Sequence, residues 1–123
     1  MKNILVVDDS LTMRRMVIAS LGGLSDVRFQ EAGSGLEAIE RLGFAGVDLM
    51  ILDLNMPDMH GLEVLKFLHG YSSYRNLPII VLTTRGDDVT REIALNHGAA
   101  RYLTKPFQPG DLAGYARQLL GAN

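Results

Sequence analysis

Short apolar segments alternate with amphipathic segments along the whole chain. The apolar segments are rich in β-branched residues or leucine and are bounded by turn residues, which is typical of strands. We predict strands at Ile4–Val7, Val27–Phe29, Leu49–Leu52, Ile79–Leu82 and Arg101–Leu103. Most of their apolar residues are consecutive rather than alternating, and this pattern favours strands that are covered on both faces, as in a parallel sheet.

An amphipathic segment follows each predicted strand. Apolar residues recur there at helical spacing, next to residues that commonly begin or end helices. The first predicted helix has Ser10 as its N-cap, apolar residues from Met13 to Leu24 and Gly22-Gly23 near its end. The other predicted helices lie after Ser34, at 62–68, from Asp87 to Gly98 and from Pro109 to Gly121. Ser34 and Glu37 have the spacing of a capping box. Five strand–helix units predict an α/β fold with a doubly wound parallel sheet.

Composition and charge narrow the class of protein. The chain has 123 residues, which fits a single domain, so we expect one domain over 1–123. Its net charge of −2 gives no electrostatic reason to bind nucleic acid or an anionic membrane. The absence of cysteine excludes disulfides and thiolate metal sites. The apolar run at the start is too short for a signal peptide or a membrane span, and we therefore expect a cytoplasmic protein.

The residues that follow the predicted strands carry the candidate chemistry. These residues are Asp8, Asp9, Asp53, Thr83 and Lys105. Ligands of doubly wound sheets bind beyond the carboxyl ends of the strands, so parallel strands would bring these side chains to one edge. Three carboxylates there demand a counter-cation, and an all-oxygen ligand set suits Mg²⁺. Together with a hydroxyl and an ammonium they form a cradle for phosphoryl oxygens, in which Asp53 is the candidate nucleophile.

These segments resemble the receiver domains of two-component response regulators over essentially the whole chain. The resemblance rests on Asp8-Asp9, on Asp53-Leu54-Asn55-Met56-Pro57 with Gly61, on Thr83 and on Lys105-Pro106-Phe107. The stretch from Ser10 to Arg15 is most similar to the single-domain chemotaxis regulators. The resemblance implies a flavodoxin-like (βα)5 fold with strand order 2-1-3-4-5.

The resemblance also implies roles for the acidic residues. Asp53 is the implied phosphoacceptor, and Lys105 is the implied partner of a phosphoryl oxygen. The implied Mg²⁺ ligands are Asp9 and Asp53 directly, Asp8 through a water molecule, and Asn55 through its backbone carbonyl. These roles make Mg²⁺ the expected cofactor.

Further implied roles concern switching and the lifetime of the phosphorylated state. Thr83 resembles the switch hydroxyl, and Tyr102 resembles the aromatic residue that changes rotamer behind it. Lys105-Pro106 resembles the cis peptide bond of the family. Asn55 and Arg85 occupy positions that modulate the rate of dephosphorylation.

Some residues depart from the family pattern. His60 stands where aspartate is common and is expected to be a weaker N-cap, and Thr84 is bulkier than usual, which would narrow access to the phosphorylation site. These departures concern the lifetime of the phosphorylated state rather than its formation. Arg14 and Arg15 are interpreted as part of a solvated helix face.

Three other classes of function fit the sequence less well. The segment 33–38 matches G-x-G-x-x-A, but a dinucleotide site should follow the first strand, where Asp8-Asp9 would repel a pyrophosphate. A metal-dependent aspartyl phosphatase needs a carboxylic acid two residues after its nucleophile, and Asn55 occupies that position. A pure interaction module with a vestigial pocket is disfavoured because the pocket residues are intact.

We therefore expect a signalling switch that catalyses only its own phosphoryl transfer and dephosphorylation, and is not otherwise an enzyme. The expected partners are a sensor histidine kinase or phosphotransfer protein and a separate downstream target, for which the resemblance suggests the flagellar motor switch. Few residues follow Lys105, so we expect no output domain. We expect a monomer, but the sequence is also compatible with a dimer, with a phosphate shuttle or sink, and with a receiver excised from a larger transcriptional regulator.

Overall fold

The computed structural model describes residues 1–44 and 46–121. Strands and helices alternate in the order β1 (Lys2–Val7), α1 (Leu11–Ser20), β2 (Val27–Ala32), α2 (Gly35–Phe44), β3 (Leu49–Leu52), α3 (Gly61–His69), β4 (Ile79–Thr83), α4 (Asp88–Asn96), β5 (Arg101–Thr104) and α5 (Pro109–Leu120). The strands are parallel and lie in the order β2-β1-β3-β4-β5. The predicted doubly wound fold and its strand order are therefore confirmed. Among the helices of the described residues, none combines the length and hydropathy that a membrane span requires.

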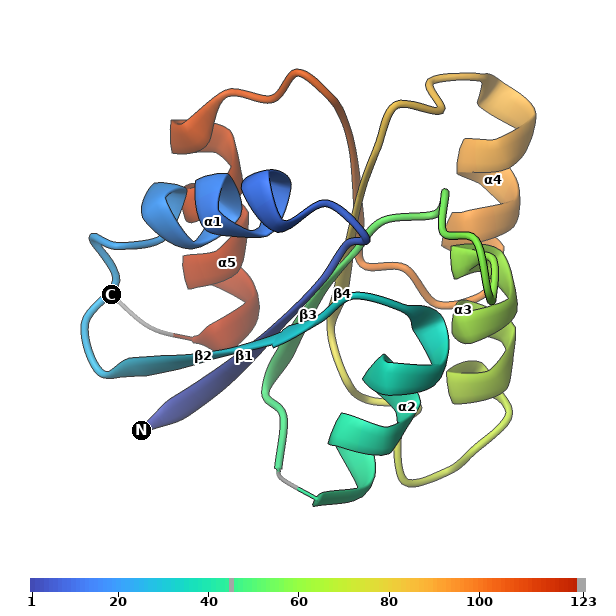
Figure 1. Cartoon of the computed structure of the whole chain (residues 1–123), viewed down its shortest axis with the longest axis horizontal. Coiled ribbons are helices and arrows are strands. Elements are labelled where there is room, and N and C mark those ends of the chain that lie inside the picture. Colours follow the sequence, from blue (N-terminus) through green and yellow to red (C-terminus); the bar gives the residue numbers. More distant parts are fainter. Residues whose placement is uncertain (45, 122–123) are drawn as a thin grey trace.

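Helices cover both faces of the sheet (Figure 1). Helices α1 and α5 lie on one face, and α2, α3 and α4 lie on the other. Alternate residues of β1 enter different cores: Leu5 and Val7 pack on the α2–α4 side, whereas Ile4 and Val6 pack on the α1–α5 side. All four side chains are fully buried. Burial on both faces is the reason why the apolar residues of this strand are consecutive in the sequence.

Strand β2 is longer than the apolar pattern predicts. It continues to Ala32, whereas the prediction ended at Phe29. In the described part of the chain β2 pairs with β1 alone, so it is an edge strand. Gln30 and Glu31 are partly exposed there, and an edge strand tolerates such polar side chains.

Helix α1 ends earlier than predicted. It ends at Ser20, and Leu21 is its C-cap, whereas the apolar spacing extended the prediction to Leu24. The two glycines that follow Leu21 end the helix, because glycine favours helix ends. Leu24 nevertheless returns to the core with an exposed fraction of 6 %.

The starts of α2 and α3 also differ from the prediction. Ser34 Oγ accepts a hydrogen bond from the Glu37 amide at 3.1 Å, but the Glu37 carboxylate accepts from the Gly33 amide, so the predicted capping box is half formed. At α3 the His60 imidazole accepts from the first turn, and the Glu63 carboxylate accepts from the His60 amide. The complete capping box therefore belongs to α3, with His60 as its N-cap.

Candidate functional site

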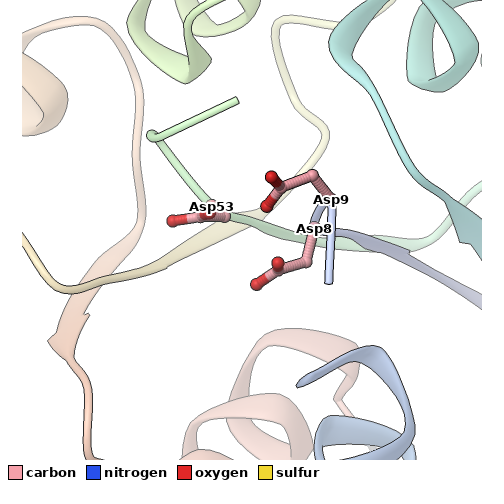
Figure 2. Close-up of side chains that lie close together, drawn as sticks. All are labelled: Asp8, Asp9 and Asp53. Carbon is pink, nitrogen blue, oxygen red and sulfur yellow. The ribbon is translucent and has the colours of Figure 1, made fainter. Parts of the chain in front are cut away.

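The carboxyl ends of β1 and β3 bring three aspartates together (Figure 2). Asp8 and Asp9 follow β1 directly, and Asp53 follows the neighbouring strand β3. One carboxylate oxygen of each lies within 4.8 Å of the other two, and the carboxylates project to the same side of the strand ends. Asp8 and Asp53 are 4 % and 5 % exposed, whereas Asp9 is exposed. The site is thus an acidic pocket with two buried carboxylates and one at its mouth.

Lys105 reaches the same pocket from the loop after β5. Its Nζ donates a hydrogen bond to Oδ2 of Asp8 at 2.7 Å and lies 3.7 Å from Oδ1 of Asp53. The Lys105 side chain is largely buried, and the peptide bond to Pro106 is cis. The ammonium group therefore lies beside two buried carboxylates, but its hydrogen bond goes to Asp8.

Oδ1 of Asp53 differs from the other polar atoms of the pocket in its hydrogen bonding. Within residues 1–44 and 46–121 it is the one buried side-chain oxygen or nitrogen that has no hydrogen-bond partner. Burial raises the pKa of the Asp53 carboxyl above its ordinary value, the Lys105 ammonium opposes this, and the negative charge of Asp8 adds to it. A buried, unpaired carboxylate oxygen beside two further carboxylates fits a hard divalent cation such as Mg²⁺, which prefers oxygen ligands.

Thr83 and Tyr102 are both hydrogen-bonded to the loop between β4 and α4. Thr83, at the end of β4, is fully buried, and its hydroxyl accepts a hydrogen bond from the Arg85 amide at 3.4 Å. The hydroxyl of Tyr102 in β5 donates to the backbone carbonyl of Arg85, and the ring is 9 % exposed. The backbone of Arg85 therefore connects the two residues.

The side chains of Arg85 and Asn55 make contacts at the surface of the same region. The Arg85 guanidinium lies 3.4 Å from the Asp87 carboxylate and donates to the Thr90 hydroxyl at 3.2 Å, so it is directed to the start of α4. Hydrogen bonds from Thr90 lower the pKa of Asp87 to about 2. Nδ2 of Asn55 donates to the hydroxyl of Thr84 at 3.1 Å.

Arg14 has a role that the sequence did not reveal. Its Nε pairs with the Glu31 carboxylate of β2 at 3.0 Å, and its Nη1 donates to the backbone carbonyl of Asp8 at 2.7 Å. The side chain is 15 % exposed, so its assignment to a solvated helix face was wrong, whereas Arg15 is 67 % exposed and fits it. Arg14 therefore connects α1 to β2 and to the acidic turn that follows β1. The two arginines are adjacent in the sequence, and the sequence does not show which of them is buried.

Comparison with known proteins identifies the family. Residues 4–117 match the response regulator receiver domain family, and the chain belongs to that family. The resemblance seen in the sequence is therefore confirmed. The chain is 40 % identical over 121 residues to the chemotaxis protein CheY1 of Helicobacter pylori, with 98 % of each chain covered. It is 40 % identical over 119 residues to the chemotaxis protein CheY homolog of Campylobacter jejuni, covering 96 % of this chain and 92 % of that protein. The crystallized chemotaxis protein CheY4 of Vibrio cholerae matches with a TM-score of 0.87 and 34 % identity, over 98 % of this chain and 99 % of the other.

Proposed function

We propose that the chain is a phosphorylation-dependent signalling switch in which Asp53 accepts a phosphoryl group from a phosphohistidine of a sensor kinase or phosphotransfer protein. One observation carries the proposal: Oδ1 of Asp53 is buried and has no hydrogen-bond partner among the described residues, beside two carboxylates and 3.7 Å from the Lys105 ammonium. In the transfer, an Asp53 oxygen forms a bond to phosphorus while the phosphorus–nitrogen bond of the donor breaks. The electron pair of that bond returns to the imidazole nitrogen.

Different pocket residues are proposed to bind Mg²⁺ and the phosphoryl group. Asp8, Asp9, Asp53 and the backbone carbonyl of Asn55 would hold Mg²⁺, whose charge, when bound, offsets that of the carboxylates and phosphoryl oxygens. Lys105 supplies a further positive charge for a phosphoryl oxygen, and for this its Nζ exchanges the hydrogen bond that it makes with Asp8. The proposal therefore gives Lys105 two successive partners.

Thr83 and Tyr102 are proposed to couple the pocket to the outer surface. Movement of the Thr83 hydroxyl toward the phosphoryl group would take it away from the Arg85 amide, and Tyr102 is hydrogen-bonded to the carbonyl of the same residue. Phosphorylation would then shift an equilibrium between two arrangements of the β4–α4 loop. A shift from 1:99 to 99:1 needs about 5.5 kcal/mol of differential stabilisation, so a partial shift also fits this coupling.

We further propose that the switch acts in chemotaxis and in the cytoplasm, and that its signal passes to a separate protein. The support is that the chemotaxis proteins named above match almost the whole chain. The surface formed by α4, β5 and α5 is the proposed reporting surface, with a component of the flagellar motor switch as its target. Tyr102 lies in β5 and would connect this surface to the pocket.

Intact-protein mass spectrometry after incubation with acetyl phosphate, with and without Mg²⁺, tests the phosphoacceptor. The wild-type chain should gain a single phosphoryl adduct that requires Mg²⁺, and the Asp53→Asn variant should gain none. Asp26→Asn is the matched control, because it removes one aspartate whose side chain is 76 % exposed before β2. An adduct on Asp53→Asn would contradict the assignment. No adduct on the wild type, together with no binding of beryllofluoride, would indicate a receiver fold that is used only for docking.

A further inference from the structure

A side-chain hydrogen bond joins two loops at the edge of the aspartate pocket. Nδ2 of Asn55, on the β3–α3 loop, donates to Oγ1 of Thr84, on the β4–α4 loop, at 3.1 Å. Among the described residues, no second hydrogen bond joins these two loops. Asn55 lies two residues after Asp53, and Thr84 directly follows Thr83.

Burial places this bond on the solvent side of the pocket. Asn55 and Thr84 are exposed, whereas Asp53 is 5 % exposed and Thr83 is fully buried. Strands β3 and β4 are neighbours in the sheet and pair Leu52 with Val81, so Asp53 and Thr83 both lie at its carboxyl edge, and Asn55 and Thr84 follow them in the loops. The hydrogen bond therefore lies at the solvent-exposed surface, between the residues that adjoin Asp53 and Thr83 in the chain.

We propose that the Asn55–Thr84 hydrogen bond is a latch across the mouth of the pocket and that Thr84 is the positioning residue that closes it. This inference rests on the proposed function, because it concerns the entry of a phosphodonor and of water to Asp53. The hydrogen bond forms only when both loops adopt one arrangement, and it breaks when either loop moves. The size of Thr84 alone would not join the loops. Its hydroxyl, rather than its bulk, is therefore the feature that matters.

A latch of this kind changes two rates in the same direction. Phosphorylation by acetyl phosphate needs the donor to enter, and hydrolysis needs water to enter. In hydrolysis the water oxygen forms a bond to phosphorus, the bond between phosphorus and Asp53 breaks, and the water proton leaves with inorganic phosphate or to solvent. Loss of the latch should accelerate both reactions about two- to tenfold, the factor that one neutral hydrogen bond provides. Affinity for Mg²⁺ should change by a smaller factor than the two rates, because the three carboxylates and the Asn55 backbone carbonyl are present in every variant.

Three variants of Thr84 separate the hydrogen bond from bulk. Thr84→Val keeps the shape and removes the hydroxyl, Thr84→Ser keeps the hydroxyl with one methyl group fewer, and Thr84→Ala removes both. Intact-protein mass spectrometry gives the rate of phosphorylation by acetyl phosphate at fixed Mg²⁺, and the rate of loss of the adduct after the donor is removed. The valine and alanine variants should accelerate both reactions, and the serine variant should match the wild type. The circular dichroism spectrum should be unchanged in all three, and the affinity for Mg²⁺ in titration should change less than the two rates.

The outcomes distinguish failure of the latch from failure of the proposed function. A valine variant with wild-type rates would overturn the latch and leave the phosphoacceptor intact, and acceleration in the alanine variant alone would assign the effect to bulk. A valine variant in which only one of the two rates changes would also overturn the latch. Absence of any adduct on the wild-type chain would overturn the proposed function and the latch with it.

Discussion

Replacement of Asp53 by asparagine should make the domain more stable when no divalent cation is bound. The Asp53 side chain is 5 % exposed, and its Oδ1 is unpaired among the residues that the structure describes. It also lies within 4.8 Å of carboxylate oxygens of Asp8 and Asp9. Asparagine has nearly the same shape and carries no charge. The substitution therefore measures the cost of burying this charge.

The magnitude follows from the neighbours of Asp53. At an effective dielectric constant of about 20, attraction by Lys105 at 3.7 Å is about 4.5 kcal/mol, and repulsion by Asp8, which lies within 4.8 Å, is about 3.5 kcal/mol or more, so the two nearly cancel. The exposed Asp9 is screened by solvent and changes this balance less. The remaining contribution is the free-energy cost of burying an oxygen without a hydrogen bond, which is about 1–3 kcal/mol. The asparagine amide is also polar, so the variant still bears part of this cost. We expect the free energy of unfolding to rise by about 1–2 kcal/mol.

The stabilisation should depend on pH. Burial raises the pKa of Asp53 in the folded protein, so the folded state keeps this proton to a higher pH than the unfolded chain does. The difference between variant and wild type should be absent below the ordinary value of 3.8, grow as the pH rises through the folded pKa, and be complete above it. Mg²⁺ should reduce the difference at neutral pH, because it stabilises the wild type more.

Urea unfolding followed by circular dichroism in the presence of a chelator measures this difference. The control Asp26→Asn removes an exposed carboxylate and should change the free energy of unfolding by less than about 0.5 kcal/mol. An Asp53→Asn variant that is no more stable than the wild type at neutral pH, without divalent cations, would refute the electrostatic account of the pocket.

Three further predictions concern other parts of the molecule. Gly61→Ala should lower the free energy of unfolding by about 3 kcal/mol or more, because a Cβ there would lie 2.5 Å from two backbone atoms. In the control Gly114→Ala the new Cβ meets no described atom within 4 Å, so this variant should raise the free energy of unfolding by about 1 kcal/mol in the same urea assay. Thr90→Val should raise the pKa of Asp87 from about 2 toward 3.8, and a carboxyl NMR titration that shows no change would refute the role of the hydroxyl. Lys105→Met should tighten Mg²⁺ binding about tenfold by removing a cation 2.7 Å from a pocket carboxylate, and weaker binding by calorimetry would contradict this.

The sequence could predict the fold because the central strands are buried on both faces. The consecutive apolar residues of β1, β3 and β4 mark such strands, and the first polar residue after each one marks the carboxyl edge of the sheet. The same reasoning predicts that Asp8, Asp9 and Asp53 meet at one edge of the sheet, as they do in the structure. It failed for the second half of β2, where edge position allows polar residues that look like a loop in the sequence.

Side-chain pairing between distant segments could not be predicted in this way. Asn55 and Thr84 are 29 positions apart, and Lys105 and Asp8 are 97 positions apart. The Lys105 ammonium lies 2.7 Å from a carboxylate oxygen of Asp8 and 3.7 Å from one of Asp53, and the spacing along the chain does not determine which hydrogen bond forms. The sequence predicted which residues meet at the pocket, whereas the structure was needed to show how they are paired.

The pairing explains why one pocket should both bind a cation and present a nucleophile. Three carboxylates and the Lys105 ammonium give the pocket a net charge of −2 when Asp53 is ionised, and the hydrogen bond of Lys105 goes to Asp8 rather than to Asp53. An anionic phosphodonor would be repelled by this charge, whereas a divalent cation would neutralise it. Burial raises the pKa of Asp53, and its Oδ1 has no hydrogen-bond partner within the described residues. The cation requirement and the availability of the nucleophile therefore have one physical origin, so a substitution that pairs Asp53 with a new hydrogen-bond donor should weaken both.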